Sequence, residues 1–254
     1  MSRRPRLLLT CALALLALPC ATGPAHADLR IHIGQSVKGR PIVAFRSGPR
    51  DAPLEVLVVG AIHGDETAGM RIARRLIQAP PIPGVRLYVV PTINPDGVAA
   101  GTRGNAHGVD LNRNFPYRWR PLDGGEYSGP HPLSEPEAWG AYGFIYLHRP
   151  DVTIWFHQPF GLIDRPDGNP FAAHRFSDLI GLPLHRLPGS YPGSASRWQT
   201  HAFPWSTAFV AELPQQVSNS LISRGTAAVH TLAAELASPA VLSLPSTFRL
   251  REAG

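Results

Sequence analysis

The sequence predicts a single α/β domain in which a mixed, mostly parallel β-sheet carries helices on both faces. Two patterns support this fold class. Apolar runs of strand length alternate with segments of helical periodicity along most of the chain. Several of these runs are almost continuously apolar, as expected for strands that are buried on both faces. The length of 254 residues also suits one large domain, because α/β domains often reach roughly 200–250 residues.

The first half of the chain supplies a hairpin, two buried strands and a helix. Residues 29–48 alternate in polarity around Lys38 and Gly39, which predicts a hairpin with its bend at that pair. Two apolar runs, LEVLVVGA (54–61) and VRLYVVPTI (85–93), predict buried strands. Residues 67–78 between them predict a helix that stops at a proline-rich segment.

The second half continues the alternation. The stretch SEPEAWGAYGFIYLH predicts a helix, with Ser134 as its N-cap, Pro136 in the first turn and Glu137 completing a capping box. Two further strands are predicted, DVTIWFH (151–157), which ends at His157, and STAFVAEL (206–213), which ends near Glu212. The last predicted element is a closing amphipathic helix, SLISRGTAAVHTLAAELA (220–237).

Residues 1–27 are expected to be an export signal, which leaves residues 28–254 as one catalytic domain. The segment has three arginines near its start, an apolar stretch over residues 7–18, and small residues before position 28. The apolar stretch is shorter than the roughly 20 residues that span a bilayer, which disfavours an uncleaved anchor. The pair Arg3-Arg4 leaves both the general and the twin-arginine export routes open. We expect an exported protein, periplasmic or secreted, without stable membrane insertion once the signal is removed.

Cysteine content and charge exclude several classes of protein. Both cysteines, Cys11 and Cys20, lie in the predicted signal, so the remaining chain cannot be a disulfide scaffold, a thiol enzyme or a cysteine-ligated zinc protein. Removal of the signal, with three arginines and no acid, lowers the formal net charge from +6 to +3. The chain has one lysine and no basic stripe interleaved with aromatic residues, which argues against nucleic acid as a partner.

Polar residues with metal-binding or catalytic chemistry follow several predicted strands. His63, Asn94, His157 and Glu212 all lie at or just past a strand end. In sheets of this kind, ligands bind at the carboxyl ends of the strands. This convergence indicates a site at one edge of the sheet.

His63, Glu66 and His157 are the candidate metal ligands. Catalytic zinc commonly takes two histidines and one carboxylate and keeps an open position for water. His63 and Glu66 are three residues apart, so both can point the same way where the helix begins. A His-x-x-Glu pair alone is more often an ordinary helix start. Ligand type indicates one Zn²⁺ ion, although cobalt or manganese fits the same set.

The polar, glycine-rich segment at residues 94–116 carries four further candidates. Loops of more than about 12–15 residues in compact domains are usually functional or disordered. Arg103 and Arg113 offer planar groups suited to carboxylates and oxyanions, beside Asn112. Asp110 can hold the second ring nitrogen of a ligand histidine. Glu212, an acid within an apolar strand, is a candidate general base and acid next to a metal-activated water.

The chain resembles the zinc carboxypeptidase family of the carboxypeptidase A type, and within it the short bacterial branch of murein peptide amidases. The resemblance runs from about residue 33 to residue 213 and is carried by an ordered set of motifs: IGQSVKGRPI, GAIHGDE, NPDG, VDLNRNFP, YSGPHPLSEPE and FVAELP. It implies the carboxypeptidase fold and hydrolysis of the γ-D-glutamyl-meso-diaminopimelate bond of murein peptides. The partner it implies is a peptide with a free carboxylate.

The resemblance also implies roles for individual residues. His63, Glu66 and His157 would hold zinc, and Glu212 would be the general base. In the segment at residues 94–116, Arg103 would stabilise the oxyanion, Asn112 and Arg113 would bind the substrate's free carboxylate, and Asp110 would orient His63.

Two further residues are candidate substrate contacts. Tyr191 lies in the region where larger family members have a tyrosine over the substrate, although its loop is unlike theirs. In the murein hypothesis, Asp164 would pair the ammonium of diaminopimelate.

Three other functions remain open. A broad exported carboxypeptidase and an N-acyl amino acid deacylase would use the same zinc site. A non-catalytic murein-binding module belongs to a different class, and the presence of Glu212 and of every candidate ligand argues against it.

Overall fold

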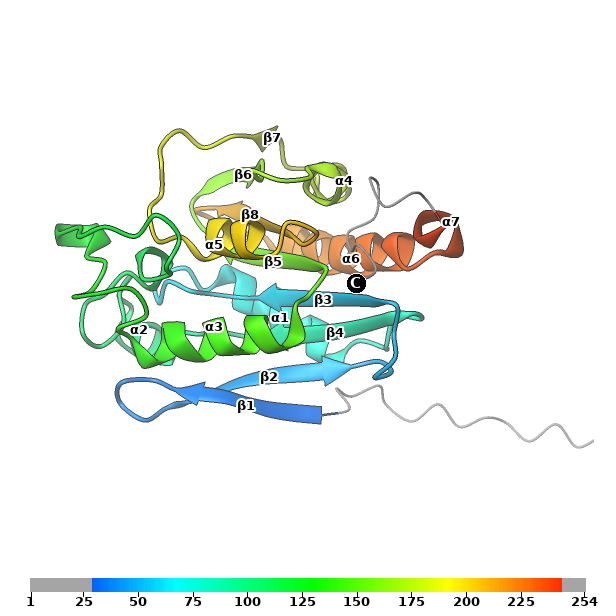
Figure 1. Cartoon of the computed structure of the whole chain (residues 1–254). Helices are drawn as coiled ribbons and strands as arrows, with labels where there is room; N and C mark the ends of the chain where they lie inside the picture. The colour runs from blue at the N-terminus through cyan, green and yellow to red at the C-terminus, as the bar shows by residue number, and fades with distance from the viewer. Residues whose placement is uncertain (1–28, 244–254) are drawn as a thin grey trace, which may run out of the picture.

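The computed structural model of the chain describes residues 29–243, so the predicted export signal lies outside the described residues. One eight-stranded sheet forms the centre of the domain (Figure 1). Its strands are β1 (Leu29–Gln35), β2 (Pro41–Ser47), β3 (Leu54–Val59), β4 (Val85–Val90), β5 (Val152–His157), β6 (Phe160–Asp164), β7 (Leu184–His185) and β8 (Thr207–Pro214). The helices are α1 (Ala68–Gln78), α2 (Pro95–Ala100), α3 (Pro136–His148), α4 (Phe171–Ile180), α5 (Ala195–Ala202), α6 (Asn219–Leu236) and α7 (Pro239–Leu242), with 3₁₀ turns η1 (Leu111–Arg113) and η2 (Gly124–Glu126).

The sheet is mixed, with a parallel centre. Its strand order is β1-β2-β4-β3-β5-β8-β6-β7. The pairs β4-β3, β3-β5 and β5-β8 are parallel, whereas β1-β2, β2-β4 and β8-β6 are antiparallel. The carboxyl ends of β3, β5 and β8 therefore lie at the same edge of the sheet. This arrangement confirms the predicted fold class and places the candidate residues that follow these strands at one edge.

Helices cover both faces of the sheet, as predicted. Alternate residues of β3 enter opposite cores: Val56 and Val58 pack with α1, α4 and α6, whereas Leu57 and Val59 pack with α3 and α5. Figure 1 shows α3 and α5 in front of the sheet, and α1 and α6 behind it. Burial on both faces explains why these strands read as nearly continuous apolar runs.

The predicted capping box of α3 is wrong. The helix begins at Pro136, and its N-cap is Glu135 without a side-chain cap hydrogen bond. Ser134 donates instead to Glu135 Oε1 at 2.8 Å, and Glu137 Oε1 accepts from the Val37 backbone N–H at 3.0 Å. Ser134 Oγ also accepts from Asn114 Nδ2 at 2.9 Å, so both side chains that local spacing assigned to the cap are bound elsewhere.

Residues 160–202 contain elements that the sequence pattern did not predict, namely β6, β7, α4 and α5. The two strands are short, at five and two residues, and only partly buried, so they lack a strong period-2 signal. Within residues 29–243, none of the helices is both long and apolar enough to cross a membrane.

Candidate active site

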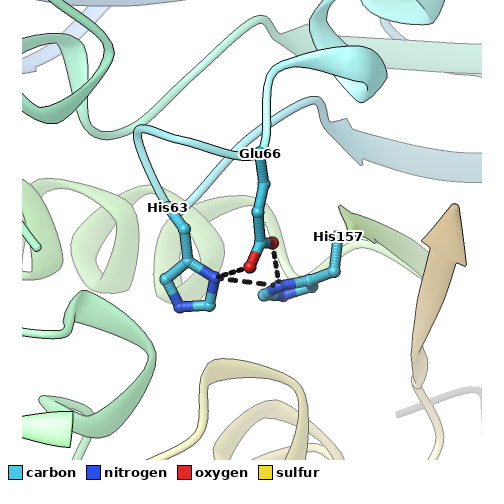
Figure 2. Close-up of side chains that lie close together, drawn as sticks. All are labelled: His63, Glu66 and His157. Carbon is cyan, nitrogen blue, oxygen red and sulfur yellow. Dashed lines mark hydrogen bonds and ion pairs between the residues drawn. The ribbon is translucent and has the colours of Figure 1, made fainter. Parts of the chain in front are cut away.

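His63, Glu66 and His157 come together where β3 and β5 end. His157 is the last residue of β5, and His63 and Glu66 lie in the turn between β3 and α1. Both residues precede α1, which begins at Ala68, so the turn brings them together and the helix does not. All three are buried, and Figure 2 shows their polar atoms pointing toward one another.

The distances within this group fit one tetrahedral ion. The Nδ1 atoms of His63 and His157 are 3.2 Å apart, and each lies 2.9 Å from an oxygen of Glu66. Two nitrogen ligands about 2.05 Å from a tetrahedral zinc ion are about 3.3 Å apart. Two imidazoles and one carboxylate are also the donor set of catalytic zinc sites. Among the described residues, this is the one group of histidines and acids close enough to share an ion.

Asp110 and Arg103 lie directly behind the ligand group. Asp110 Oδ1 is 3.0 Å from His63 Nε2, the ring nitrogen that faces away from Glu66. Arg103 Nε and Nη2 donate to Asp110 Oδ2 at 3.0 and 2.8 Å, and Arg103 Nη1 is 3.2 Å from Glu66 Oε1. The predicted partner of His63 is therefore in contact with it, and the predicted oxyanion-binding arginine borders the ligands.

Electrostatics stabilise the charged state of Asp110. Burial alone would raise the pKa of Asp110, but the positive charge and hydrogen bond of His63 and the charge of Arg103 outweigh it, so this pKa lies well below its ordinary value. A carboxylate that stays ionised fixes the orientation of the imidazole and keeps Nδ1 directed at the metal position.

Glu212 lies in β8 opposite His157, with which it is paired in register. Its side chain is buried, and its Oε2 has no hydrogen-bond partner among the described residues. Burial, followed by the negative charge of Glu66, raises the pKa of Glu212 to about 7. A carboxyl group whose pKa lies near neutral pH suits general acid–base catalysis.

Arg113 and Asn112 belong to η1 and line the same cavity as the ligand group. The Asn112 Oδ1 accepts from the Ala195 backbone N–H at 3.0 Å, which leaves its amide NH₂ group available to a ligand. The Arg113 Nη1 donates to the Asn112 carbonyl at 3.0 Å, and its Nη2 forms an ion pair with Glu126. Arg113 is buried, and this contact with Glu126 was not predicted.

A close backbone approach sets the position of η1. Gly193 has a φ of 70°, and a Cβ atom there would lie 2.0 Å from the Arg113 carbonyl oxygen. The Gly193 carbonyl in turn accepts from Phe115 N at 2.9 Å. Only glycine permits both the left-handed conformation and this contact.

These groups line one cavity of about 560 Å³. It contains nine of the ten predicted site residues: His63, Glu66, Arg103, Asn112, Arg113, His157, Asp164, Tyr191 and Glu212. The tenth, Asp110, is buried behind His63. The cavity volume is of the size that small-molecule and peptide pockets usually have.

Tyr191 and Asp164 also line the cavity. The Tyr191 ring packs against the guanidinium groups of both Arg113 and Arg197, at 5.2 and 5.0 Å from its centroid. Its hydroxyl donates to the Pro188 carbonyl at 2.8 Å, so in this conformation it does not point at the ligand group. Burial raises the pKa of Asp164, whose Oδ1 accepts from Leu187 N at 2.8 Å.

Three of the cavity residues that were not predicted interact with predicted site residues. Arg197 lies near Asp164 and lowers the pKa of that carboxyl through its charge. Glu126 pairs with Arg113. Gln158 donates its backbone N–H to Glu66 Oε2 at 3.1 Å and accepts from the first N–H of α1 through its side chain. Of these, only Gln158 had a signal in the sequence, as the polar residue directly after His157.

Comparisons with known proteins show the family to which the chain belongs. The sequence model of the zinc carboxypeptidase family matches residues 25–159. Murein peptide amidase A of Escherichia coli is 31% identical over 182 residues, which cover 66% of this chain and 74% of that protein. The catalytic chain of human carboxypeptidase N is 36% identical over 160 residues, covering 50% of this chain and 34% of that one.

Solved structures show the same fold. The crystal structure of murein-tripeptide amidase from Escherichia coli O157 superposes with a TM-score of 0.67 at 25% identity, covering 84% of this chain and 93% of that one. Carboxypeptidase A from Helicoverpa armigera gives a TM-score of 0.69 at 18% identity and covers 82% of this chain and 68% of that one. The chain therefore belongs to the zinc carboxypeptidase family and is a metallopeptidase.

Proposed function

We propose that this metallopeptidase hydrolyses the γ-D-glutamyl-meso-diaminopimelate bond of murein peptides and releases diaminopimelate. The observation that carries the proposal is the charge distribution in the cavity. The cavity that holds the candidate ligands is also lined by the guanidinium group of Arg113 and by a further acid and base, Asp164 and Arg197. Diaminopimelate has a matching set of charges, with one carboxylate beside the scissile bond and an ammonium and a carboxylate at its far end. The similarity to murein peptide amidase A supports the same substrate.

The residues divide the reaction between them. The guanidinium of Arg113 and the amide of Asn112 bind the carboxylate next to the scissile nitrogen and so position the amide bond. Glu212 removes a proton from the attacking water and later donates it to the leaving amine. Arg103 donates to the developing oxyanion from its place beside Glu66. His63, Glu66 and His157 would hold the zinc ion, whose Lewis acidity would polarise the carbonyl and lower the pKa of water.

Asp164 and Arg197 explain a preference for diaminopimelate over ordinary C-terminal residues. Asp164 is half-buried and lines the same cavity as the proposed carboxylate-binding residues. Arg197 is held by its stacking on Tyr191 and by a hydrogen bond from Nη1 to the Ser190 carbonyl at 2.5 Å. The charge of Arg197 acts on Asp164, and an acid and a base that line one cavity can bind a zwitterionic group better than a neutral side chain.

Three peptides that differ only in the last residue test this assignment. L-Ala-γ-D-Glu can be followed by meso-diaminopimelate, by L-lysine, which lacks the far carboxylate, or by L-norleucine, which lacks both charges. We expect Asp164→Asn to lower kcat/KM about ten- to a hundred-fold for the first two peptides and little for the third. Arg197→Gln should impair only the diaminopimelate peptide. Equal losses on all three peptides for both variants would contradict the proposed pocket.

A broad carboxypeptidase is the second candidate, because it requires the same ligands and the same grip on a free carboxylate. The similarity to carboxypeptidase N supports it. The norleucine peptide separates the two functions: a broad carboxypeptidase cleaves it as fast as the diaminopimelate peptide in the unaltered protein. An N-acyl amino acid deacylase would instead prefer a simple acyl group to the dipeptide.

We also propose that the protein is exported after cleavage before residue 28. The basic start, the short apolar stretch and the small residues that precede this position support the proposal. Mass spectrometry of the protein isolated from its cells should find a chain that starts at Asp28. A full-length chain that sediments with membranes would contradict it.

A further inference from the structure

Glu126 binds the guanidinium group to which the proposed function assigns the substrate's carboxylate. The Glu126 Oε1 forms an ion pair with Arg113 Nη2. Both side chains line the substrate cavity; the Arg113 side chain is 4% exposed and the Glu126 side chain is 54% exposed. A buried cation in the cavity thus faces an acid that is anchored at the surface of the same chain.

The guanidinium of Arg113 has a fixed position and few other partners. Its Nη1 donates to the Asn112 carbonyl, its Nε has no hydrogen-bond partner, and the Tyr191 ring covers one face at 5.2 Å. Glu126 is the one ion-pair partner of Arg113 within residues 29–243. A carboxylate that approached this group from the cavity would therefore compete with Glu126 for the same Nη2 donor.

Glu126 can move aside without disturbing the core. It ends the 3₁₀ turn η2, in which residues 123–126 are all exposed. Gly124 has a φ of 64°, and no atom lies within 4 Å of the Cβ position at Gly124 or Gly125. Rotation of the exposed Glu126 side chain breaks its ion pair with Arg113 and leaves the hydrophobic core unchanged.

We propose that Glu126 is an internal competitor that occupies the carboxylate site of Arg113 in the free enzyme and is displaced by the substrate's free carboxylate. The proposal rests on the role of Arg113 in the proposed function. Glu126 lowers the apparent affinity for every ligand that must displace it, because only the fraction of molecules with a free Arg113 can bind. An ion pair with one exposed partner predicts an effect of about two- to five-fold.

Three variants test the displacement. Glu126→Gln removes the competing charge. Asp123→Asn removes an equal charge from an exposed side chain of the same turn, which makes no cap hydrogen bond and does not line the cavity. Glu126→Gln combined with Arg113→Gln, compared with Arg113→Gln alone, shows whether the effect of Glu126 acts through Arg113. Circular dichroism verifies that each variant is folded.

The probes are meso-diaminopimelate, N-acetyl-L-leucine and N-acetyl-L-leucinamide, titrated calorimetrically into the zinc-loaded protein. We expect Glu126→Gln to bind both acids about two- to five-fold more tightly and the amide unchanged. Asp123→Asn should leave all three affinities unchanged, and the gain should vanish without Arg113. The proposal would be overturned if Glu126→Gln binds the acids no more tightly, if Asp123→Asn shows an equal gain, or if the protein binds neither of the two acids.

The outcome is separable from the substrate assignment. If Glu126→Gln binds N-acetyl-L-leucine more tightly but no protein binds diaminopimelate, the displacement stands and the murein substrate fails. If the murein tripeptide is cleaved but Glu126→Gln gains nothing, the substrate stands and the displacement fails.

Discussion

Substitution of Glu212 by glutamine should abolish hydrolysis and, in the metal-free protein, raise stability in a pH-dependent way. Burial and the charge of Glu66 raise the pKa of Glu212 from an ordinary value of about 4.5 to about 7. The unfolded chain ionises this carboxyl at the lower pH, so ionisation favours unfolding between the two values. The folded protein therefore loses stability as the pH rises, and the loss is complete above pH 7.

The difference between the two pKa values sets the magnitude. Each pKa unit corresponds to about 1.4 kcal/mol, so the ionised carboxyl destabilises the metal-free fold by about 3 kcal/mol at pH 8. At pH 5 the same carboxyl destabilises the metal-free fold by only about 1 kcal/mol. Glutamine is neutral at both pH values and lacks this penalty. Its advantage should thus grow by about 2 kcal/mol between pH 5 and pH 8, or roughly 4–8 °C in Tm for a domain of this size.

Thermal unfolding in the presence of a chelator measures this advantage at pH 5 and pH 8. Glu235→Gln is the control, because Arg175 lowers the pKa of Glu235 and removes any reason for a gain at high pH. An advantage of Glu212→Gln that is the same at both pH values, or a loss at pH 8, would refute the claim that Glu212 is held in an unfavourable environment.

Three further expectations follow from the site. Asp110→Asn should lower zinc affinity about 10- to 100-fold in a chelator competition, because the variant no longer holds His63 with a charge, and an unchanged affinity would contradict that role. The acid limb of kcat/KM should lie between pH 4.5 and 7, since a nearby dication lowers the pKa of Glu212 from about 7, and a limb above pH 7 would exclude Glu212 as the base. Gly193→Ala should destabilise the fold by more than about 1 kcal/mol in urea unfolding, because its Cβ would displace the Arg113 carbonyl. The same displacement should weaken carboxylate binding. A variant as stable as the wild type would refute this expectation.

The ligand group was predictable because it depends on strand ends. His157 ends a strand that reads as buried from its composition, and His63 follows another such strand, so parallel pairing alone brings them to one edge. The contact between Asp110 and His63 was expected from the resemblance to the zinc carboxypeptidase family, because the strand topology does not fix the path of the loop that carries Asp110. Periodicity and the geometry of a parallel sheet account only for the meeting of the strand ends.

The surroundings of Asp164 and Arg113 in the cavity were not predictable in the same way. Arg197 lies on α5, a short helix in a region where the sequence pattern is weak, and its approach to Asp164 depends on the path of residues 160–196. The ion pair between Glu126 and Arg113 depends on a surface turn that has no periodic signal. For the same reason, the cap of α3 failed as a prediction: Asn114 and Val37, both distant in the sequence, bind the side chains of Ser134 and Glu137.

Digestion of L-Ala-γ-D-Glu-meso-diaminopimelate by the purified protein, followed by mass spectrometry with and without a zinc chelator, tests both the zinc dependence and the murein substrate. We expect release of diaminopimelate that stops with the chelator and returns when zinc is added, while the norleucine peptide remains largely intact. Cleavage that persists without metal would contradict the ligand group formed by His63, Glu66 and His157. Equal cleavage of both peptides would retain the zinc site and contradict the murein substrate.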